Sequence, residues 1–139
     1  MITRMAEATT LGREFATALA AKDFESIAEL LHPEVEFRAL TPRRSWEAGD
    51  PETVISGVLR EWFEDTDQIE ALEQIETDAF ADRERVGYRF RVRAPDGLFV
   101  VEQQVFIGER DGRIDWMRAL CSGFRPIVDG DDEGGEARS

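Results

Sequence analysis

The sequence predicts an α+β fold in which helices and strands occupy different halves of the 139-residue chain. In the first half, apolar residues recur at helical spacing, whereas in the second half they alternate with polar residues at period two. Short glycine-containing turns separate the alternating runs. Segregation of this kind favours a largely antiparallel sheet with helices packed on one of its faces.

Three helices are expected in the first half. The first has a one-sided apolar stripe formed by Leu11, Phe15, Ala18 and Leu19. Asp23 is typical of an N-cap for a second helix, and "HP" at 32–33 ends that helix, because proline disfavours helix in the residue before it. Asp50-Pro51 begins the third helix with an N-cap and a proline at the first helical position.

The strands are predicted from alternation and from turn residues. A first strand covers 34–40, and the segment 41–50 after it is predicted to be a loop. The segment 67–80 is ambiguous, because its apolar spacing also suits a helix. The last three strands are expected at 85–94, 98–109 and 114–124. The turns "APDG" and "RDGR" join them into a meander.

Composition excludes several classes of partner. A formal charge of −13 argues against nucleic acid and against anionic membrane surfaces, both of which attract clustered Lys and Arg. The apolar runs are shorter than a membrane span. With one cysteine and no Cys/His cluster, the sequence predicts no disulfide, no metal site and no redox cofactor. A reduced, cytoplasmic compartment is the simplest interpretation.

One domain is expected over 8–127. It is preceded by a flexible N-terminus at 1–7 and followed by an acidic tail at 128–139, which is predicted to be disordered because it is almost devoid of apolar residues.

Two stretches carry a family resemblance. "REFATALAAKDFESIAELLHPEVEF" (13–37) and "DGRIDWMRAL" (111–120) are similar to the opening helices with first strand, and to the closing hairpin, of the nuclear-transport-factor-2-like superfamily. Its members include ketosteroid isomerase, limonene epoxide hydrolase, scytalone dehydratase and SnoaL-like polyketide cyclases. The resemblance covers about 8–125. It implies a curved mixed or antiparallel sheet forming a cone-shaped half-barrel, with the three helices covering the concave face. Such a fold does not fix one activity.

The known catalytic positions of these relatives hold other residues in this chain. The resemblance puts Phe15 where ketosteroid isomerase has its tyrosine, Ala39 at its general base and Gln104 at its oxyanion-hole aspartate. Ala119 stands where limonene epoxide hydrolase has an aspartate of its water-activating array. Steroid-isomerase chemistry in its known form is therefore not expected, and the epoxide-hydrolase array lacks a carboxylate.

The same resemblance implies which strand faces point into the cone. The expected pocket-lining residues are Phe15, Leu19, Trp62, Phe63, Phe90, Val100, Phe106, Met117, Ala119 and Cys121. A mainly apolar lining of this kind is typical of a small-ligand site. Glu102 is the candidate catalytic acid or base within it, since burial raises the pKa of a carboxyl group. Gln104 and Tyr88 are candidate donors to a substrate carbonyl. The alternative is that Glu102 is solvated or paired with an arginine.

Other polar candidates have simpler structural interpretations. Trp46 either forms a lid over the cavity or pins its own loop. Asp115 lies either inside the cone or at its rim. Cys121 is expected to be a small apolar filler, because a nucleophilic thiol needs a base or a cationic setting and the only histidine, His32, is distant in sequence. The arginine row at 89–93 is expected to form salt bridges on the outer face.

The opposite face of the long strand is predicted to form a homodimer, because a face this apolar should not remain in solvent. Its expected residues are Phe99, Val101, Val105, Ile107, Trp116 and Leu120.

Three functions remain open from the sequence. The first is an acid–base enzyme, such as a cyclase, isomerase or dehydratase, that acts on an apolar carbonyl compound. The second is a non-catalytic module that binds an apolar small molecule. The third is a dimeric interaction module with a collapsed cavity.

Overall fold

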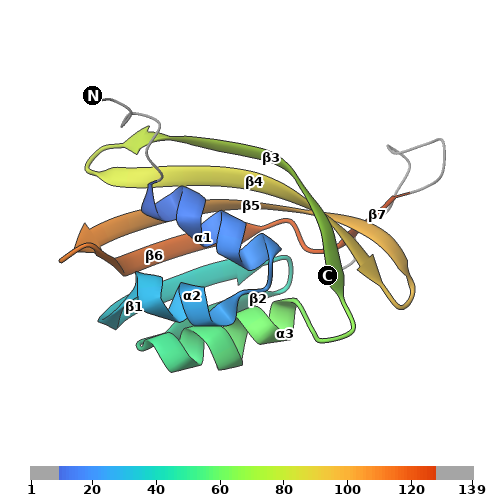
Figure 1. Ribbon diagram of the computed structural model, residues 1–139, viewed down its shortest axis with the longest axis horizontal. Helices are drawn as coiled ribbons and strands as arrows, with labels where there is room; N and C mark the ends of the chain where they lie inside the picture. The colour runs from blue at the N-terminus through green and yellow to red at the C-terminus, as the bar shows by residue number, and fades with distance from the viewer. Residues whose placement is uncertain (1–9, 128–139) are drawn as a thin grey trace.

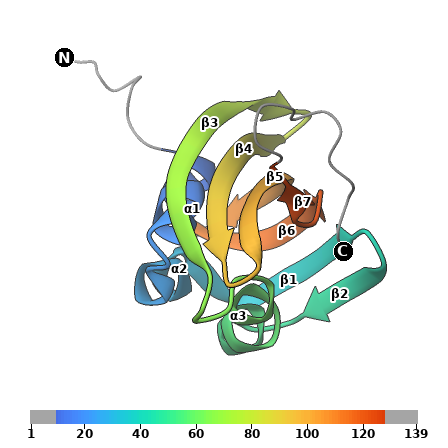
Figure 2. The same ribbon diagram turned by 90° about the vertical axis from the view of Figure 1, so that its right-hand side faces the viewer.

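A computed structural model describes residues 10–127 of the chain. One strongly curved sheet wraps around the helices, which cover its concave face (Figures 1 and 2). The N-terminal segment expected at 1–7 and the acidic tail expected at 128–139 lie outside the described residues.

The first helix contains the predicted apolar stripe, and the second begins at the predicted cap. Helix α1 (Leu11–Ala20) is capped by Thr10, whose side chain accepts a hydrogen bond from the backbone N–H of Arg13. Helix α2 (Phe24–Leu30) is capped by Asp23, whose Oδ1 accepts from the Ser26 N–H at 3.1 Å. The caps satisfy N–H groups that have no partner inside the helix.

The third helical segment differs from a regular α-helix. It consists of a π-helix, η2 (Thr53–Leu59), followed by a short α-helical turn, α3 (Arg60–Trp62). Asp50 caps it as expected, because its carboxylate accepts from the N–H and the hydroxyl of Thr53. Every apolar residue of η2 except glycine is buried. π-Helical turns are rare in proteins, but those that occur often lie near functional sites. This one leads directly to Trp62.

The sheet is mixed, and the predicted α+β half-barrel is confirmed. Its strands are β1 (Leu31–Thr41), β2 (Arg44–Ala48), β3 (Gln68–Phe80), β4 (Arg83–Ala94), β5 (Gly97–Arg110), β6 (Arg113–Cys121) and β7 (Arg125–Pro126). The order is β2-β1-β6-β5-β4-β3, with β7 paired to β5. The β1–β6 pairing is parallel and the remaining described pairings are antiparallel.

The structure shows the conformation of one segment that was ambiguous in the sequence and corrects the prediction for another. The ambiguous segment 67–80 is almost entirely the edge strand β3. The segment 41–50, predicted to be a loop, contains β2, and that prediction is wrong. Thr41 pairs with Arg44 across a two-residue turn, and Trp46 then pairs with Ala39. Turn-forming residues on both sides of this five-residue strand conceal its alternation in the sequence.

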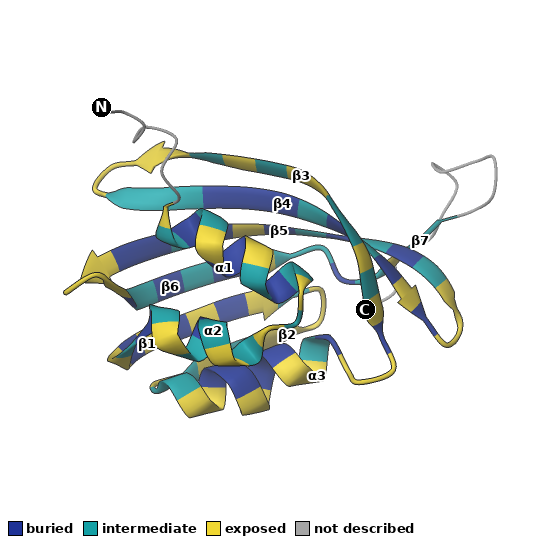
Figure 3. Ribbon diagram, viewed as in Figure 1, coloured by how far each residue is buried: buried dark blue, intermediate teal, exposed yellow. Residues whose placement is uncertain are grey.

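The core lies between the helices and the inner face of the sheet. Helix α1 packs on β3, β4 and β5, whereas α2 packs on β1 and β6. On β4 the inner face is the predicted one, formed by Val86, Tyr88, Phe90 and Val92, all buried. Buried residues run along the central strands, and the edge strand β3 is half-buried or exposed (Figure 3). Burial of each large apolar side chain contributes about 1.5–3 kcal/mol to folding.

Strand β5 presents the face opposite to the one that the sequence analysis predicts. Its inner residues are Phe99, Val101, Gln103, Val105 and Ile107, each 3% exposed or less. The residues predicted to point inward, Val100, Glu102, Gln104 and Phe106, are half-buried or exposed on the outer face. The predicted inward orientation of these four is therefore wrong. The four β5 residues expected at the dimer face (Phe99, Val101, Val105 and Ile107) are buried instead.

A β-bulge in the β5–β6 hairpin accounts for this reversal. The pairing register shifts by one residue at Asp115, which has no pairing partner on β5. If the regular pairing continued from the turn, Glu102 would lie opposite Cys121; the structure places Gln103 there instead. Because side chains alternate with period two, a one-residue shift moves every side chain of a strand to the other face.

Candidate functional site

A pocket of about 500 Å³ opens at one end of the sheet. We call it the end pocket. Its walls are the β1–β2 turn, α3 with the loop 63–67, the β4–β5 turn and the chain segment that follows β6. These segments lie at the right-hand end of the molecule in Figure 1 and face the viewer in Figure 2. Four regions distant in sequence therefore form a single pocket.

Aromatic side chains form much of the end-pocket wall. Trp46 and Trp62 meet edge to face, with ring centroids 5.9 Å apart and an angle of 88° between the planes. On another side, the Phe63 and Phe124 centroids are 5.9 Å apart. Pairs of this geometry contribute about 0.5–1.5 kcal/mol beyond their buried area. They hold the rings in place before any ligand arrives.

Trp46 is fixed on β2, which answers whether it forms a lid or an anchor. Its Nε1–H donates to the Thr41 hydroxyl at 3.0 Å. The Arg44 guanidinium stacks on its ring, 3.7 Å from the ring centroid. Trp46 is held in place by its strand, by this hydrogen bond and by its ring contacts with Arg44 and Trp62. It therefore forms part of the pocket wall and also stabilises the β1–β2 hairpin.

Trp62 is half-buried and carries a polar atom that lacks a partner. Its Nε1 is buried and makes no hydrogen bond within residues 10–127, although Trp62 lines the end pocket. A buried donor left unpaired costs about 1–3 kcal/mol. Each such group calls for an explanation, and an acceptor on a bound molecule is one.

The remaining polar residues of the end pocket are mainly acidic. They include Glu61, Glu64, Asp67 and Asp96. Asp67 is 8% exposed, and its carboxylate accepts from the N–H of Glu64 at 3.0 Å, which closes the loop after α3. Lys22 reaches this loop from the α1–α2 turn and donates to the carbonyl oxygens of Glu64 and Asp67 at 2.6 and 2.7 Å. The loop is thus anchored to the body of the protein.

A hydrogen-bonded chain runs from the core to the pocket wall. The Tyr88 hydroxyl donates to Gln103 Oε1, and the Gln103 amide donates to Cys121 Sγ at 3.2 Å. Burial raises the pKa of the Tyr88 hydroxyl well above its usual value and also raises the pKa of the Cys121 thiol. Both groups therefore stay protonated and neutral near neutral pH, and Cys121 is a poor nucleophile.

The deeper part of the predicted cavity is filled by side chains. Phe15, Leu19, Phe90 and Met117 are each at most 1% exposed, and they belong to the packed core. Ala119 is also buried. Of the predicted pocket-lining residues, Trp62, Phe63 and Cys121 line the end pocket. The predicted lining role of Val100 and Phe106 is wrong, because the bulge at Asp115 shifts the β5–β6 register and both residues lie on the outer face.

The predicted catalytic pair lies outside the cone. Glu102 accepts from Arg89, with Nη2 and the carboxylate 3.0 Å apart, and its side chain is 41% exposed. Gln104 accepts from Arg85. Both border a shallow outer depression of about 360 Å³, whereas the Tyr88 hydroxyl points inward to Gln103. The three groups therefore do not converge. Pairing of Glu102 with an arginine was the alternative that the sequence left open, and the structure has it.

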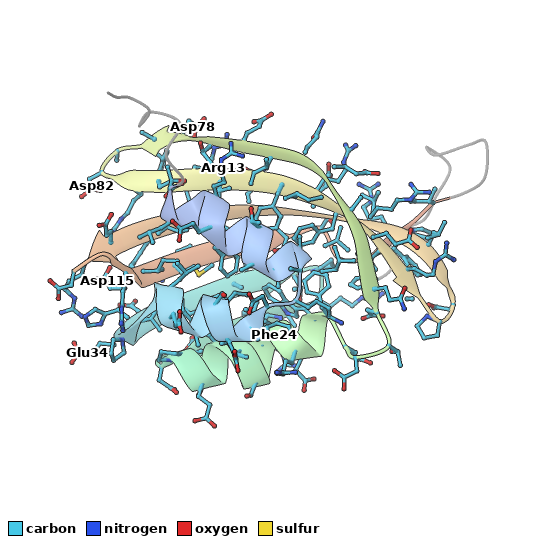
Figure 4. All side chains as sticks on the ribbon, viewed as in Figure 1. Arg13, Phe24, Glu34, Asp78, Asp82 and Asp115 are labelled. Carbon is cyan, nitrogen blue, oxygen red and sulfur yellow. The ribbon has the colours of Figure 1, made fainter. Side chains whose placement is uncertain are left out.

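A separate polar cluster occupies the opposite end of the sheet. Arg110 bonds Glu34 at 3.0 Å and lies 3.4 Å from the Asp115 carboxylate. Glu34 and Asp115 appear together on the left of Figure 4, away from the end pocket. His32 accepts from the Glu34 N–H in the same cluster. Asp115 is therefore a rim residue, and neither it nor His32 borders the pocket.

Sequence analysis missed Gln103, Phe124 and the acidic residues of the pocket. The signal for Gln103 is present: its neighbours at every second position, Phe99, Val101, Val105 and Ile107, form the more apolar face of the strand. The acidic residues lie in loops, where spacing gives no indication of convergence.

Two negative findings concern residues 10–127. They contain no group of three or more His, Cys, Asp or Glu side chains arranged to hold a metal ion. They also contain no helix of the length and apolarity that a membrane span needs.

Comparison with known proteins identifies structural neighbours. The sequence matches no protein-family model and none of the curated proteins. Its fold is similar to that of a proposed isomerase from Bacillus subtilis, with a TM-score of 0.69 and 14% identity over 87% of this chain and 90% of the other. It is also similar to an LEH-like epoxide hydrolase from M. tuberculosis, with a TM-score of 0.59 and 14% identity over 81% and 80% of the two chains.

A third neighbour is a proposed polyketide cyclase from Xanthomonas campestris pv. campestris, with a TM-score of 0.63 and 16% identity over 79% of this chain and 86% of the other. At such identities the likeness concerns the backbone and not the chemistry. The chain has the cone-shaped fold of the nuclear-transport-factor-2-like superfamily.

Proposed function

We propose that this protein binds a largely apolar small molecule in the end pocket. The observation that carries the proposal is the aromatic wall formed by Trp46, Trp62, Phe63 and Phe124 around a space of about 500 Å³. Pockets for small ligands occupy about 300–1,000 Å³ and combine apolar walls with a few polar groups.

The polar groups of the pocket support a ligand with one hydrogen-bond acceptor. Trp62 Nε1 is buried without a partner, and the Cys121 thiol stays protonated. An acceptor atom on the ligand would pair with the indole N–H and remove the cost of its burial.

Acid–base catalysis on the bound molecule is the second candidate. It is favoured by the Tyr88–Gln103–Cys121 chain, which ends at a protonated thiol on the pocket wall. Such a donor could polarise a carbonyl group. In this case Cys121→Ala would retain ligand binding and lose turnover of the ligand, whereas a pure binding protein would show no turnover in either form.

The experiment for binding uses two tryptophan variants that differ only in location. Apolar compounds with a carbonyl or hydroxyl group are screened by tryptophan fluorescence and by their protection of Cys121 from thiol reagents. Trp62→Phe keeps an aromatic ring, smaller than the indole, and removes the N–H, and it should weaken binding about three- to tenfold. Trp116→Phe, on the outer face, should leave affinity unchanged. A panel in which no compound alters fluorescence or labelling rate would refute the proposal.

We also propose that two copies pair through the outer face of the sheet. The large apolar residues most exposed are Leu40 (52%), Phe80 (60%) and Leu120 (49%). Leu40 pairs directly with Leu120 across β1 and β6, and Phe80 contacts Phe106 with ring centroids 5.3 Å apart. Arginines and acidic residues interleave on the same face, so a second copy offers matching charges. Of the six residues predicted for this interface, Trp116 and Leu120 are on the outer face.

A further inference from the structure

Lys22 is the only lysine of the chain, and it lies in the turn between α1 and α2 with a backbone φ of +54°. Its N–H donates to the Leu19 carbonyl at 2.9 Å, and the N–H of Asp23 donates to the Ala18 carbonyl at 2.8 Å. This is the Schellman arrangement that ends many helices, in which the left-handed residue is usually glycine. A lysine at this position therefore has a backbone cost that glycine would avoid.

The Lys22 side chain reaches a segment that is distant in sequence. Its Nζ donates to the carbonyl oxygens of Glu64 and Asp67 at 2.6 and 2.7 Å. No carboxylate of the described residues lies within ion-pair distance of this ammonium. Hydrogen bonds from a charged donor are stronger than those between neutral groups. The ammonium thus binds the backbone of the turn 64–67.

Two internal hydrogen bonds close the turn 64–67. The Asp67 N–H donates to the Glu64 carbonyl at 2.9 Å, and the Asp67 carboxylate accepts from the Glu64 N–H at 3.0 Å. Lys22 binds the carbonyl oxygens at both ends of this closed turn. An ammonium has three donors on a single nitrogen, so one atom can serve both oxygens. Lys22 therefore joins the turn as a unit to the helical layer.

The same turn forms part of the end-pocket wall. Phe63 directly precedes it and packs between Phe90 and Phe124, with ring centroids 5.8 and 5.9 Å away. Trp62 is the next residue back along the chain. A displacement of the turn would therefore move part of the aromatic wall with it. The residues of the turn that line the pocket are Glu64, Thr66 and Asp67.

We propose that Lys22 is a positioning residue of the end pocket: its ammonium holds the turn 64–67 in place, and the pocket wall opens when these two hydrogen bonds break. This inference rests on the proposed function, because it names the residue that keeps the binding wall in shape. The backbone conformation supports it. Glycine would end the helix at lower cost, whereas only a long cationic side chain at this position supplies the two hydrogen bonds to the turn.

The test compares two variants that both remove the ammonium. Lys22→Met keeps the unfavourable backbone conformation, whereas Lys22→Gly relieves it, so Lys22→Gly should have the higher urea midpoint of the two. Hydrogen exchange of the Glu64 and Asp67 amides in the native protein reports opening of the turn. In both variants this exchange should be about tenfold or more faster than in the wild type, because two charge-assisted hydrogen bonds are lost.

Labelling of Cys121 by iodoacetamide measures whether the pocket opens with the turn. Cys121 lines the same pocket and is the only cysteine. Both Lys22 variants should be labelled about threefold or more faster than the wild type. Low concentrations of urea should leave this acceleration unchanged, since a local opening exposes little surface. The matched control is Arg13→Met, which removes a cation that borders a separate depression beside α1, and it should leave both rates unchanged.

Three outcomes would overturn the inference. The first is unchanged exchange and labelling in both Lys22 variants. The second is faster exchange without faster labelling, which would separate the turn from the pocket. The third is a pair of rates that follow global stability, faster in Lys22→Met than in Lys22→Gly and rising steeply with urea, as a merely structural role requires.

These measurements need no ligand, so they separate the inference from the proposed function. If the Lys22 variants open the pocket but no compound of the apolar panel binds the wild type, the proposed binding fails while the role of Lys22 stands. If compounds bind and neither Lys22 variant changes the two rates, the role of Lys22 is refuted while the binding function stands.

Discussion

Tyr88 and Gln103 lie directly opposite each other on β4 and β5, and the buried tyrosine hydroxyl donates to the Gln103 side-chain oxygen. Both residues are 3% exposed or less. This pair is a polar side-chain contact on the otherwise apolar inner face of the sheet, and the Gln103 amide continues the hydrogen-bond chain to Cys121 at the pocket wall.

Two adjacent glutamines test the face of β5. Gln103→Ala leaves the Tyr88 hydroxyl buried without its acceptor and should lower the free energy of unfolding by about 1–3 kcal/mol. Gln104→Ala, on the exposed face, should change it by about 0.5 kcal/mol or less. Urea denaturation of the wild-type protein and of each variant measures both changes. Equal losses, or a larger loss for Gln104→Ala, would contradict the orientation of the strand.

The pKa of Tyr88 predicts how stability depends on alkaline pH. Burial raises that pKa well above its usual value. The native protein therefore keeps the Tyr88 hydroxyl proton at a pH of about 10, where the unfolded chain loses it. The unfolded state then binds fewer protons than the native state, and the free energy of unfolding falls as pH rises further. The contribution is fully present below that pH.

Tyrosinate absorbance measures this directly, because Tyr88 is the only tyrosine of the chain. The absorbance should rise together with the loss of native circular dichroism. The Tyr88→Phe variant should lack the part of the alkaline destabilisation that comes from ionisation of the Tyr88 hydroxyl. A tyrosinate signal that rises near about pH 10 in fully native protein would show that the hydroxyl is solvated.

Cys121 should react slowly with thiol reagents in the native protein. Burial raises the pKa of its thiol, and the thiolate is the reactive form, so labelling at neutral pH should be about tenfold or more slower than in urea-unfolded chain. Since the chain has one cysteine, the stoichiometry after unfolding is a built-in control. Labelling of native protein as fast as that of a free thiol would contradict the environment described.

The proposed dimer makes a prediction about Leu120. In the proposed dimer, an acidic side chain at this exposed, apolar position would lose its hydration against the outer face of the second copy. Leu120→Asp should therefore produce monomers in sedimentation velocity runs at micromolar protein concentration. Thr17→Asp, on the exposed side of α1, adds the same charge and should leave the association unchanged. A wild-type protein that is monomeric under these conditions would exclude the interface.

Much of the fold is predictable because it depends on local pattern. The caps at Asp23 and Asp50, the inner face of β4 and the meander of strands follow from residue spacing and turn chemistry. The sequence also contained enough information to assign which face of β5 points inward. The two-residue turn Pro95-Asp96 pairs Ala94 with Gly97, which sets Tyr88 opposite Gln103. The inward face of β5 that the family resemblance implied was wrong, because the bulge at Asp115 shifts the register and a bulge cannot be recognised from spacing alone.

The order of the helices and of every long strand, and the general fold, can be predicted from the amino-acid pattern, because they depend on periodicity within a few residues. The short strand β2, the face of β5 that points inward, and the meeting of Trp46, Trp62, Phe124 and Cys121 at one pocket become visible in the folded chain. These features depend on the parallel β1–β6 pairing, on the curvature of the sheet and on one extra residue in a hairpin. None of these has a local signature strong enough to be read along the chain.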